Sequence, residues 1–181
     1  QTSIPQTTQR ATTGATTSGA GQHDAHQQHV LAFAEIRRAT NNFDAACRIG
    51  DGGSCVVYKG ALTLALPTPA TAAPTPQQYE CAVKVLSSEA DEWVSSQFAA
   101  EVDVLTRVQH PNLVSFYAYS TGGPQKCLVL ERMDISLDQR LVTKVNPPLG
   151  WQQRAQIALA VCRALKCLHS MDPPMIHRDI K

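Results

Sequence analysis

Apolar and polar residues follow two different rhythms in the middle of the chain. From Tyr79 to Leu86 the residues alternate between two faces, as in a strand, so that Lys84 shares a face with Ala82. From Ser87 to Val108 the apolar residues return at helical spacing. The pattern therefore predicts a strand followed by a helix, with Glu101 next to the apolar stripe of that helix.

Similar patterns on either side predict the remaining elements. A strand, a glycine turn and a second strand are expected within Phe43–Lys59, and two further strands at Leu113–Tyr119 and Lys126–Leu130. A short helix is expected from Ser136, which can cap it, and a long helix at Trp151–His169. The apolar stripe of the long helix is predicted to be core. Its members are Trp151, Ala155, Ala158, Cys162, Leu165 and Leu168.

Three further segments lie outside the strands and helices described above. Residues 1–29 are rich in Thr and Gln, with Ile4 as their only large apolar residue, and are predicted to be a disordered tail. Residues 30–42 are predicted to form a lead-in helix that ends at a polar, turn-favouring segment. Residues 61–78 carry no charge and several prolines, which predicts a mobile insertion in a hairpin connection.

Composition excludes some classes of partner. The hydrophobic content of 43% is ordinary for a globular protein, and the formal charge of +1 argues against a broad nucleic-acid or anionic-membrane surface. No apolar run is long enough to predict a membrane segment. The six cysteines form no C-x-x-C pair and mostly interrupt apolar runs, which favours buried thiols in a reducing compartment.

Candidate chemistry lies at three places along the chain. Glycines at 50, 52 and 53 form a turn where backbone can approach phosphate oxygens closely, although an ordinary hairpin turn has the same pattern. Glu101 can reach Lys84 if the predicted helix packs on the sheet. Residues 177–181 read His-Arg-Asp-Ile-Lys, which matches the phosphotransfer pattern H-R-D-x-K.

The order of these motifs resembles the eukaryotic protein kinase fold over about residues 33–181. Three segments resemble plant-type receptor-like Ser/Thr kinases in particular, namely Ala39–Phe43, Val57–Gly60 and Asp172–Ile176. The resemblance implies an α+β fold: a kinase-like N-terminal lobe with a five-stranded antiparallel sheet and one helix, then the first helices of the C-terminal lobe. Residues 43–181 would be a partial kinase domain, because 181 residues are too few for a complete two-lobed kinase.

The same resemblance implies roles for matching residues. Asp179 would be the catalytic base, Lys181 would steady the γ-phosphate as in Ser/Thr kinases, and Glu101 would hold Lys84 on the α- and β-phosphates. The cofactors implied are ATP and Mg²⁺, with the metal ligands beyond Lys181, and the implied partner is a protein substrate. The implied nucleotide-binding residues are Ile49, Gly50, Gly52, Gly53, Val57, Ala82, Lys84, Leu130, Glu131 and Met133.

The expected function is an ATP-dependent protein Ser/Thr kinase that is cytoplasmic, with or without a membrane tether in a longer parent protein. The 181-residue chain, as an incomplete domain, is expected to be inactive alone. A pseudokinase-like binding module is the alternative, because Ser54 and Cys55 replace the Phe-Gly of the family's loop tip. A redox-responsive module acting through Cys55 is a third hypothesis.

Overall fold

The computed structural model describes residues 30–52, 55–66, 75–86, 92–142, 147–177 and 180. The predicted tail at residues 1–29 lies outside these ranges. So do Gly53 and Ser54 in the glycine turn, residues 67–74 of the predicted insertion, and Arg178, Asp179 and Lys181 in the H-R-D-x-K motif.

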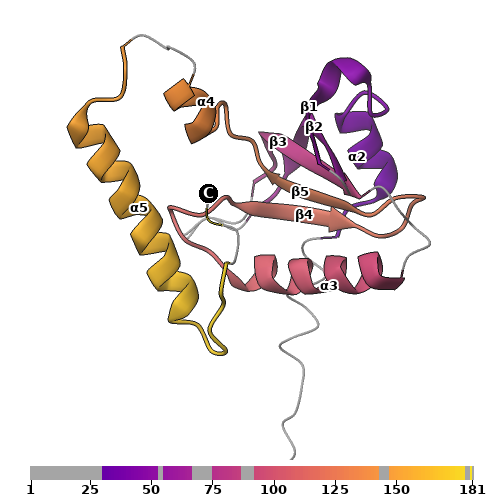
Figure 1. The fold of residues 1–181 in the computed structure, drawn as a ribbon. Coiled ribbons are helices and arrows are strands. Elements are labelled where there is room, and N and C mark those ends of the chain that lie inside the picture. The colour runs from indigo at the N-terminus through magenta and orange to yellow at the C-terminus, as the bar shows by residue number, and fades with distance from the viewer. Residues whose placement is uncertain are drawn as a thin grey trace, which may run out of the picture.

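A five-stranded antiparallel sheet forms the centre of the described structure (Figure 1). Its strands are β1 (Arg48–Gly52), β2 (Cys55–Leu64), β3 (Gln77–Leu86), β4 (Phe116–Ser120) and β5 (Cys127–Glu131). They lie in the order β1-β2-β3-β5-β4, and every neighbouring pair is antiparallel. The sheet and its helices confirm the predicted α+β class.

Several element boundaries differ from the predicted ones. The first strand starts at Arg48 rather than Phe43, because Asn41, Asn42 and Phe43 all take positive φ angles and a 3-10 turn, η1 (Ala45–Cys47), follows. Three consecutive residues in the left-handed region reverse the chain and cannot form part of a strand. The fourth strand also starts later than predicted, at Phe116 rather than Leu113.

The β2–β3 hairpin extends into the segment predicted as an insertion. Ala61 pairs with Glu80, and Leu64 pairs with Gln77, so both ends of residues 61–78 belong to strands. The first proline of the segment is Pro67, which leaves the backbone N–H groups before it free to join the ladder. Burial of the Leu64 side chain, 8% exposed, stabilises this extension.

The two faces of the sheet are buried against different helices. One face meets α2 (Phe33–Ala39), and the opposite face meets α3 (Glu92–Arg107) (Figure 1). The alternation predicted for the third strand is confirmed, since Val83 belongs to the α2 core and Leu86 to the α3 core. Buried residues on the α2 side are Ile36, Leu62, Leu64, Cys81, Val83, Val85, Ala118, Cys127 and Val129. Those on the α3 side are Leu86, Val94, Phe98, Val102 and Leu128.

Helix α2 is held on the sheet by aromatic packing. The ring centroids of Phe33 and Phe43 are 5.6 Å apart, and those of Phe43 and Tyr58 are 5.4 Å apart. A Cβ added at Gly123 would overlap the Phe33 ring, so only glycine leaves room for that side chain. At the end of the helix, Thr40 is fully buried and its hydroxyl donates to the Ile36 carbonyl at 3.0 Å. The segment before the β1 strand is thereby fixed to the sheet.

Helices α4 (Leu137–Val142) and α5 (Trp151–His169) lie beside the sheet in Figure 1. The predicted cap of the short helix is confirmed, because Ser136 Oγ accepts from Gln139 N–H at 3.1 Å. The predicted core stripe of the long helix is wrong for most of its members. Leu168 is buried, but Trp151 is 84% exposed and Cys162 is exposed as well. No described element covers most of that stripe.

The structure bears on two further predictions, the burial of the cysteines and the absence of a membrane segment. All six cysteines are free thiols, but only Cys81 and Cys127 are buried. Burial raises the pKa of Cys81 to about 11, with a smaller contribution from the neighbouring Glu80, and raises the pKa of Cys127 to about 12. In the described part of the chain, no helix is both long and apolar enough to span a bilayer.

Candidate active site

The strand register places several predicted site residues in one row. Gly50 lies opposite Val57, and Val57 in turn lies opposite Lys84. Directly opposed residues in an antiparallel ladder point to the same face of the sheet. Leu128, which is opposite Lys84 on the other side, belongs to the core under α3. The row therefore crosses the four strands β1, β2, β3 and β5 on the face that carries α3.

A second row lies two residues before Lys84 on the third strand. Ala82 is opposite Leu130, and both residues are partly buried. The alternation of the strand puts Ala82 on the same face as Lys84. Apolar side chains at 57, 82 and 130 therefore lie on the same face as the ammonium group of Lys84. A flat ligand with an anionic end would find both an apolar surface and a cation there.

Lys84 and Glu101 form the ion pair that the sequence predicts. The Lys84 Nζ atom is 2.8 Å from Glu101 Oε1 and 2.9 Å from Oε2, so the carboxylate accepts through both oxygens. The two side chains are 28% and 37% exposed. A pair this accessible contributes little to stability, on the order of 1 kcal/mol or less. Its main effect is to hold the lysine nitrogen in one place while leaving it open to a ligand.

The glycines of the turn leave backbone uncovered. A Cβ added at Gly52 would come no closer than 3.6 Å to Cys55 Sγ, and one at Gly50 would be 4.0 Å from the Val57 Cβ. Neither glycine takes a positive φ. Packing and backbone conformation would thus both tolerate a side chain, so what glycine provides here is access to the backbone. Backbone that no side chain covers can be approached closely by phosphate oxygens.

The segment after the fifth strand is held by contacts that the sequence pattern did not reveal. Glu131 N–H donates to the Ser115 carbonyl at 2.8 Å, and Ser115 Oγ donates to Glu131 Oε2 at the same distance. Arg132 bridges Glu80 at 3.0 Å and Asp134 at 3.5 Å. Long-range polar contacts leave no periodic signal, so only a motif for this segment could have indicated them. The contacts fix the backbone of Glu131, next to Leu130.

Other predicted site residues are more open or are not described. Ile49 is 49% exposed and Met133 is 53% exposed, so both lie at the rim of the face rather than within it. Gly53, Asp179 and Lys181 lie outside the described residues. Within the described ranges, no group of three or more His, Cys, Asp or Glu residues is placed to hold a metal ion.

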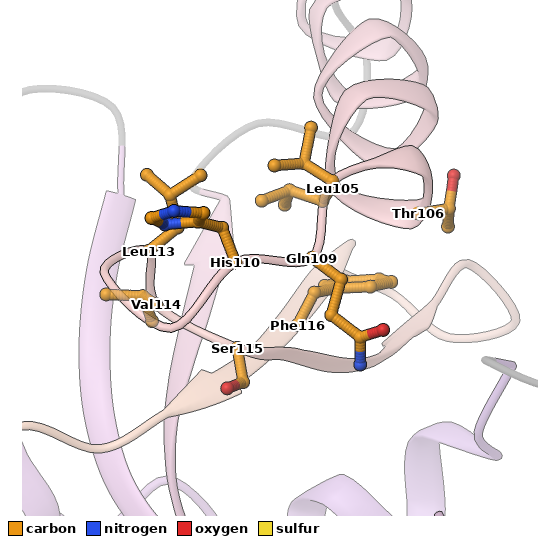
Figure 2. Close-up of a pocket in the computed structure, with 9 residues that line it drawn as sticks. Leu105, Thr106, Gln109, His110, Leu113, Val114, Ser115 and Phe116 are labelled. Atoms are coloured by element: carbon orange, nitrogen blue, oxygen red, sulfur yellow. The ribbon is translucent and has the colours of Figure 1, made fainter. Parts of the chain in front are cut away.

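A small pocket of about 170 Å³ lies where α3 ends (Figure 2). Leu105 and Thr106 contribute from the helix, and Phe116 contributes from the start of β4. The loop between them is stiffened at His110, whose Nδ1 accepts from Asn112 N–H at 3.1 Å. Sequence reasoning identified this loop only as a helix break. The pocket is close to the ion pair along the chain, since Leu105 follows Glu101 by one helical turn.

Comparison with known proteins agrees with this geometry. A family model described as protein tyrosine and serine/threonine kinase matches residues 43–181. The chain belongs to the protein kinase family. It is 37% identical over 155 residues to mouse interleukin-1 receptor-associated kinase 1, covering 82% of this chain and 20% of that protein. The sheet and α3 are therefore the N-terminal lobe of a kinase fold, and α4 and α5 are the start of its C-terminal lobe.

Two relatives from Arabidopsis thaliana have similar identities. Probable receptor-like protein kinase At5g24010 is 33% identical over 172 residues, which cover 94% of this chain and 19% of the relative. Probable serine/threonine-protein kinase PBL7 is 35% identical over 161 residues, which cover 84% of this chain and 39% of the relative. The chain thus spans between about a fifth and two fifths of the length of these three relatives. The kinase family is shown on this basis, as is the similarity to receptor-like kinases.

Proposed function

We propose that this kinase domain transfers a phosphoryl group from ATP to Ser or Thr hydroxyls of a protein substrate. The bidentate contact between Lys84 and Glu101, on the sheet face to which Gly50 and Val57 also belong, is the observation that carries the proposal. An ammonium held at a fixed position beside open backbone N–H groups is suited to a polyphosphate. The similarity to probable serine/threonine-protein kinase PBL7 supports the serine/threonine specificity.

Each described residue has a distinct part in this proposal. Bound ATP and Mg²⁺ would supply the transferable phosphoryl group and neutralise its charge. The backbone at Gly50 and Gly52 binds phosphate oxygens, while Lys84 orients the α- and β-phosphates. The apolar slot for adenine is lined by Val57, Ala82 and Leu130, with Ile49 at its rim. The backbone groups of Glu131 and Met133 bind the polar edge of adenine.

The remaining roles belong to residues outside the described ranges. Gly53 would complete the phosphate-binding turn. Asp179 would accept the proton of the substrate hydroxyl, and Lys181 would steady the γ-phosphate, as the motif implies. We also propose the division into a tail at 1–29, a lead-in helix at 30–42 and a partial kinase domain at 43–181, with an insertion between the hairpin strands.

We further propose that the polypeptide of residues 1–181 binds ATP but does not transfer phosphate by itself. In the family's order of motifs, the metal-binding Asn and Asp and the substrate platform come after the H-R-D-x-K motif. In-line transfer needs the reacting atoms held within about 3–3.5 Å, which the ion pair and the glycine turn cannot achieve alone.

The free thiols support a reducing compartment such as the cytoplasm, with or without a membrane tether.

A non-catalytic binding module is the second candidate, and Cys55 is the observation that favours it. Cys55 lies opposite Leu86 and two residues before Val57, so its side chain is on the nucleotide-facing side of β2. A thiol in place of the family's glycine narrows the room for phosphate. Replacing Ser54-Cys55 by Phe-Gly should then tighten ATP binding severalfold, measured by calorimetry. Unchanged affinity would show that the loop tip does not limit binding.

Phosphate transfer distinguishes the two candidates. Purified chain is incubated with labelled ATP, Mg²⁺ and a generic Ser/Thr substrate, next to an Asp179→Ala control. We expect no incorporation by residues 1–181, and incorporation by a chain extended through D-F-G and A-P-E that this substitution abolishes. A folded, extended chain that binds ATP without transfer would favour the binding module. Transfer by residues 1–181 that the control loses would contradict the incomplete-domain proposal.

A further inference from the structure

Lys126 contacts α3 at a point that the proposed nucleotide site does not explain. It directly precedes β5, and its carbonyl accepts a hydrogen bond from Leu86 N–H at 3.0 Å, which ties its backbone to the end of β3. Its ammonium donates a hydrogen bond to Ser95 Oγ. The same Nζ atom lies 5.8 Å from the centroid of the Phe98 ring. The partly buried ammonium group of Lys126 therefore connects the sheet to the N-terminal half of α3.

The α3 residues that Lys126 contacts share a helix face with Glu101. Ser95, Phe98 and Glu101 follow one another at i, i+3 and i+6, and neighbours three apart on a helix lie one above the other. Phe98 is 3% exposed and packs edge to face on Tyr119, with ring centroids 6.2 Å apart. Because the helix is rigid over one turn, the position of Phe98 against the sheet determines where the Glu101 carboxylate lies.

The chemistry of these contacts suits a role in positioning. Among the ion pairs of the described residues, none involves Lys126, so its charge is met there by a hydroxyl and an aromatic face. The negative face of an aromatic ring attracts a cation, and more strongly when the cation is desolvated. These partners leave the carboxylate of Glu101 to Lys84 alone. Lys84 therefore binds the Glu101 carboxylate while Lys126 contacts Ser95 and Phe98 on the preceding turns of α3, and the two ammonium groups do not compete for one acceptor.

We propose that Lys126 is a positioning residue that acts through α3 to keep Glu101 within reach of Lys84. When Lys126 is removed, the N-terminal half of α3 becomes free to tilt from the sheet, and Glu101 moves with it. Only the nucleotide-binding test of this role rests on the proposed function; the test by hydrogen exchange does not.

The first test measures amide hydrogen exchange of α3 in the 181-residue chain. Lys126→Met keeps the aliphatic stem but removes the cation, and we expect amides in 94–106 to exchange about fivefold faster. Lys126→Arg should restore protection, since a guanidinium can bind both the ring and the hydroxyl. Lys166→Met is the matched control, as it removes an exposed cation from α5 and should leave α3 unchanged. Unaltered exchange in Lys126→Met, or no rescue by arginine, would overturn the proposal.

The second test asks whether Lys126 acts through Glu101. By calorimetry, Lys126→Met should weaken ATP binding about three- to tenfold in the wild-type background. In a Glu101→Gln background the same substitution should have no further effect, because the residue that it positions is already disabled. Losses that simply add would contradict the mechanism. If the wild-type chain binds no ATP, the proposed function fails, and the exchange comparison alone decides the role of Lys126.

Discussion

The sheet with α2 and α3 can be compared with the pair formed by α4 and α5, because both regions carry apolar stripes along amphipathic helices. On α3, Phe98 and Val102 are 3% and 6% exposed, since they pack against the sheet. On α5, Cys162 is exposed and Trp151 is 84% exposed. Both stripes follow helical spacing, and the difference in exposure lies in what covers them.

An apolar stripe therefore identifies the apolar face of a helix but not the element that covers this face. The groove between α4 and α5, about 400 Å³, is lined by apolar side chains that include Leu137, Leu141 and Ile157. An apolar side chain contributes to stability only when it leaves water. The sheet region should therefore supply most of the stability of the described structure, and it also carries the candidate active site.

The largest effect is expected from matched Leu→Ala substitutions in the two regions. Leu128 has no exposed surface and lies under α3, so Leu128→Ala should lower the free energy of unfolding by about 3 kcal/mol. Leu159→Ala on α5 should change it by less than about 0.5 kcal/mol. Urea unfolding followed by circular dichroism measures both. Equal losses would show that the two regions are covered alike.

A second prediction concerns the docking of α2. Gly123→Ala brings a Cβ against the Phe33 ring and should destabilise the fold by about 2 kcal/mol. Gly122→Ala is the control, because a Cβ there meets nothing within 4 Å. Thermal unfolding should separate the two variants by several degrees, and adding Phe33→Ala should remove most of that separation. If Gly122→Ala and Gly123→Ala unfold alike, the contact with Phe33 does not hold α2.

The third prediction separates ligand binding from stability within the sheet region. Glu101→Gln removes the charge that fixes Lys84, and should weaken ATP binding about tenfold while changing the free energy of unfolding by less than about 1 kcal/mol. Asp103→Asn on the same helix breaks only an exposed pair with Arg107 and should leave the affinity within about twofold. Calorimetry measures the affinities. Equal losses in the two variants would mean that ligand binding responds to helix charge in general.

The smallest effect is a difference in thiol reactivity between the regions. Cys162 on α5 is exposed and should react with iodoacetamide at pH 8, whereas Cys81 and Cys127 should react only after unfolding, as mass spectrometry can show. Burial raises the pKa of both buried thiols from 9.0, to about 11 and about 12. Their protonated form favours the folded state, so this contribution is present below pH 9 and decreases as the pH rises toward 11–12. Labelling of Cys127 in the folded chain would contradict the burial of the sheet core.

Much of the sheet region was predictable because its signals are local. The alternation around Lys84 and the helical spacing around Glu101 put both residues on facing surfaces, and the structure confirms their pairing at 2.8 Å. The start of β1 was not predictable in this way. The positive φ angles at 41–43 arise where Thr40 is buried and hydrogen-bonded against α2, a tertiary environment that no period in the sequence reports.

The sequence alone determined which residues alternate, which segments are helical and which motifs could bind a phosphate, since these depend on neighbours a few positions apart. Only the tertiary structure decided what covers each apolar stripe and which distant side chains meet. The contacts of Lys126 with Ser95 and Phe98, and of Ser115 with Glu131, join residues far apart in the chain. Such contacts depend on how the elements pack, and packing is a property of the whole fold rather than of any one segment.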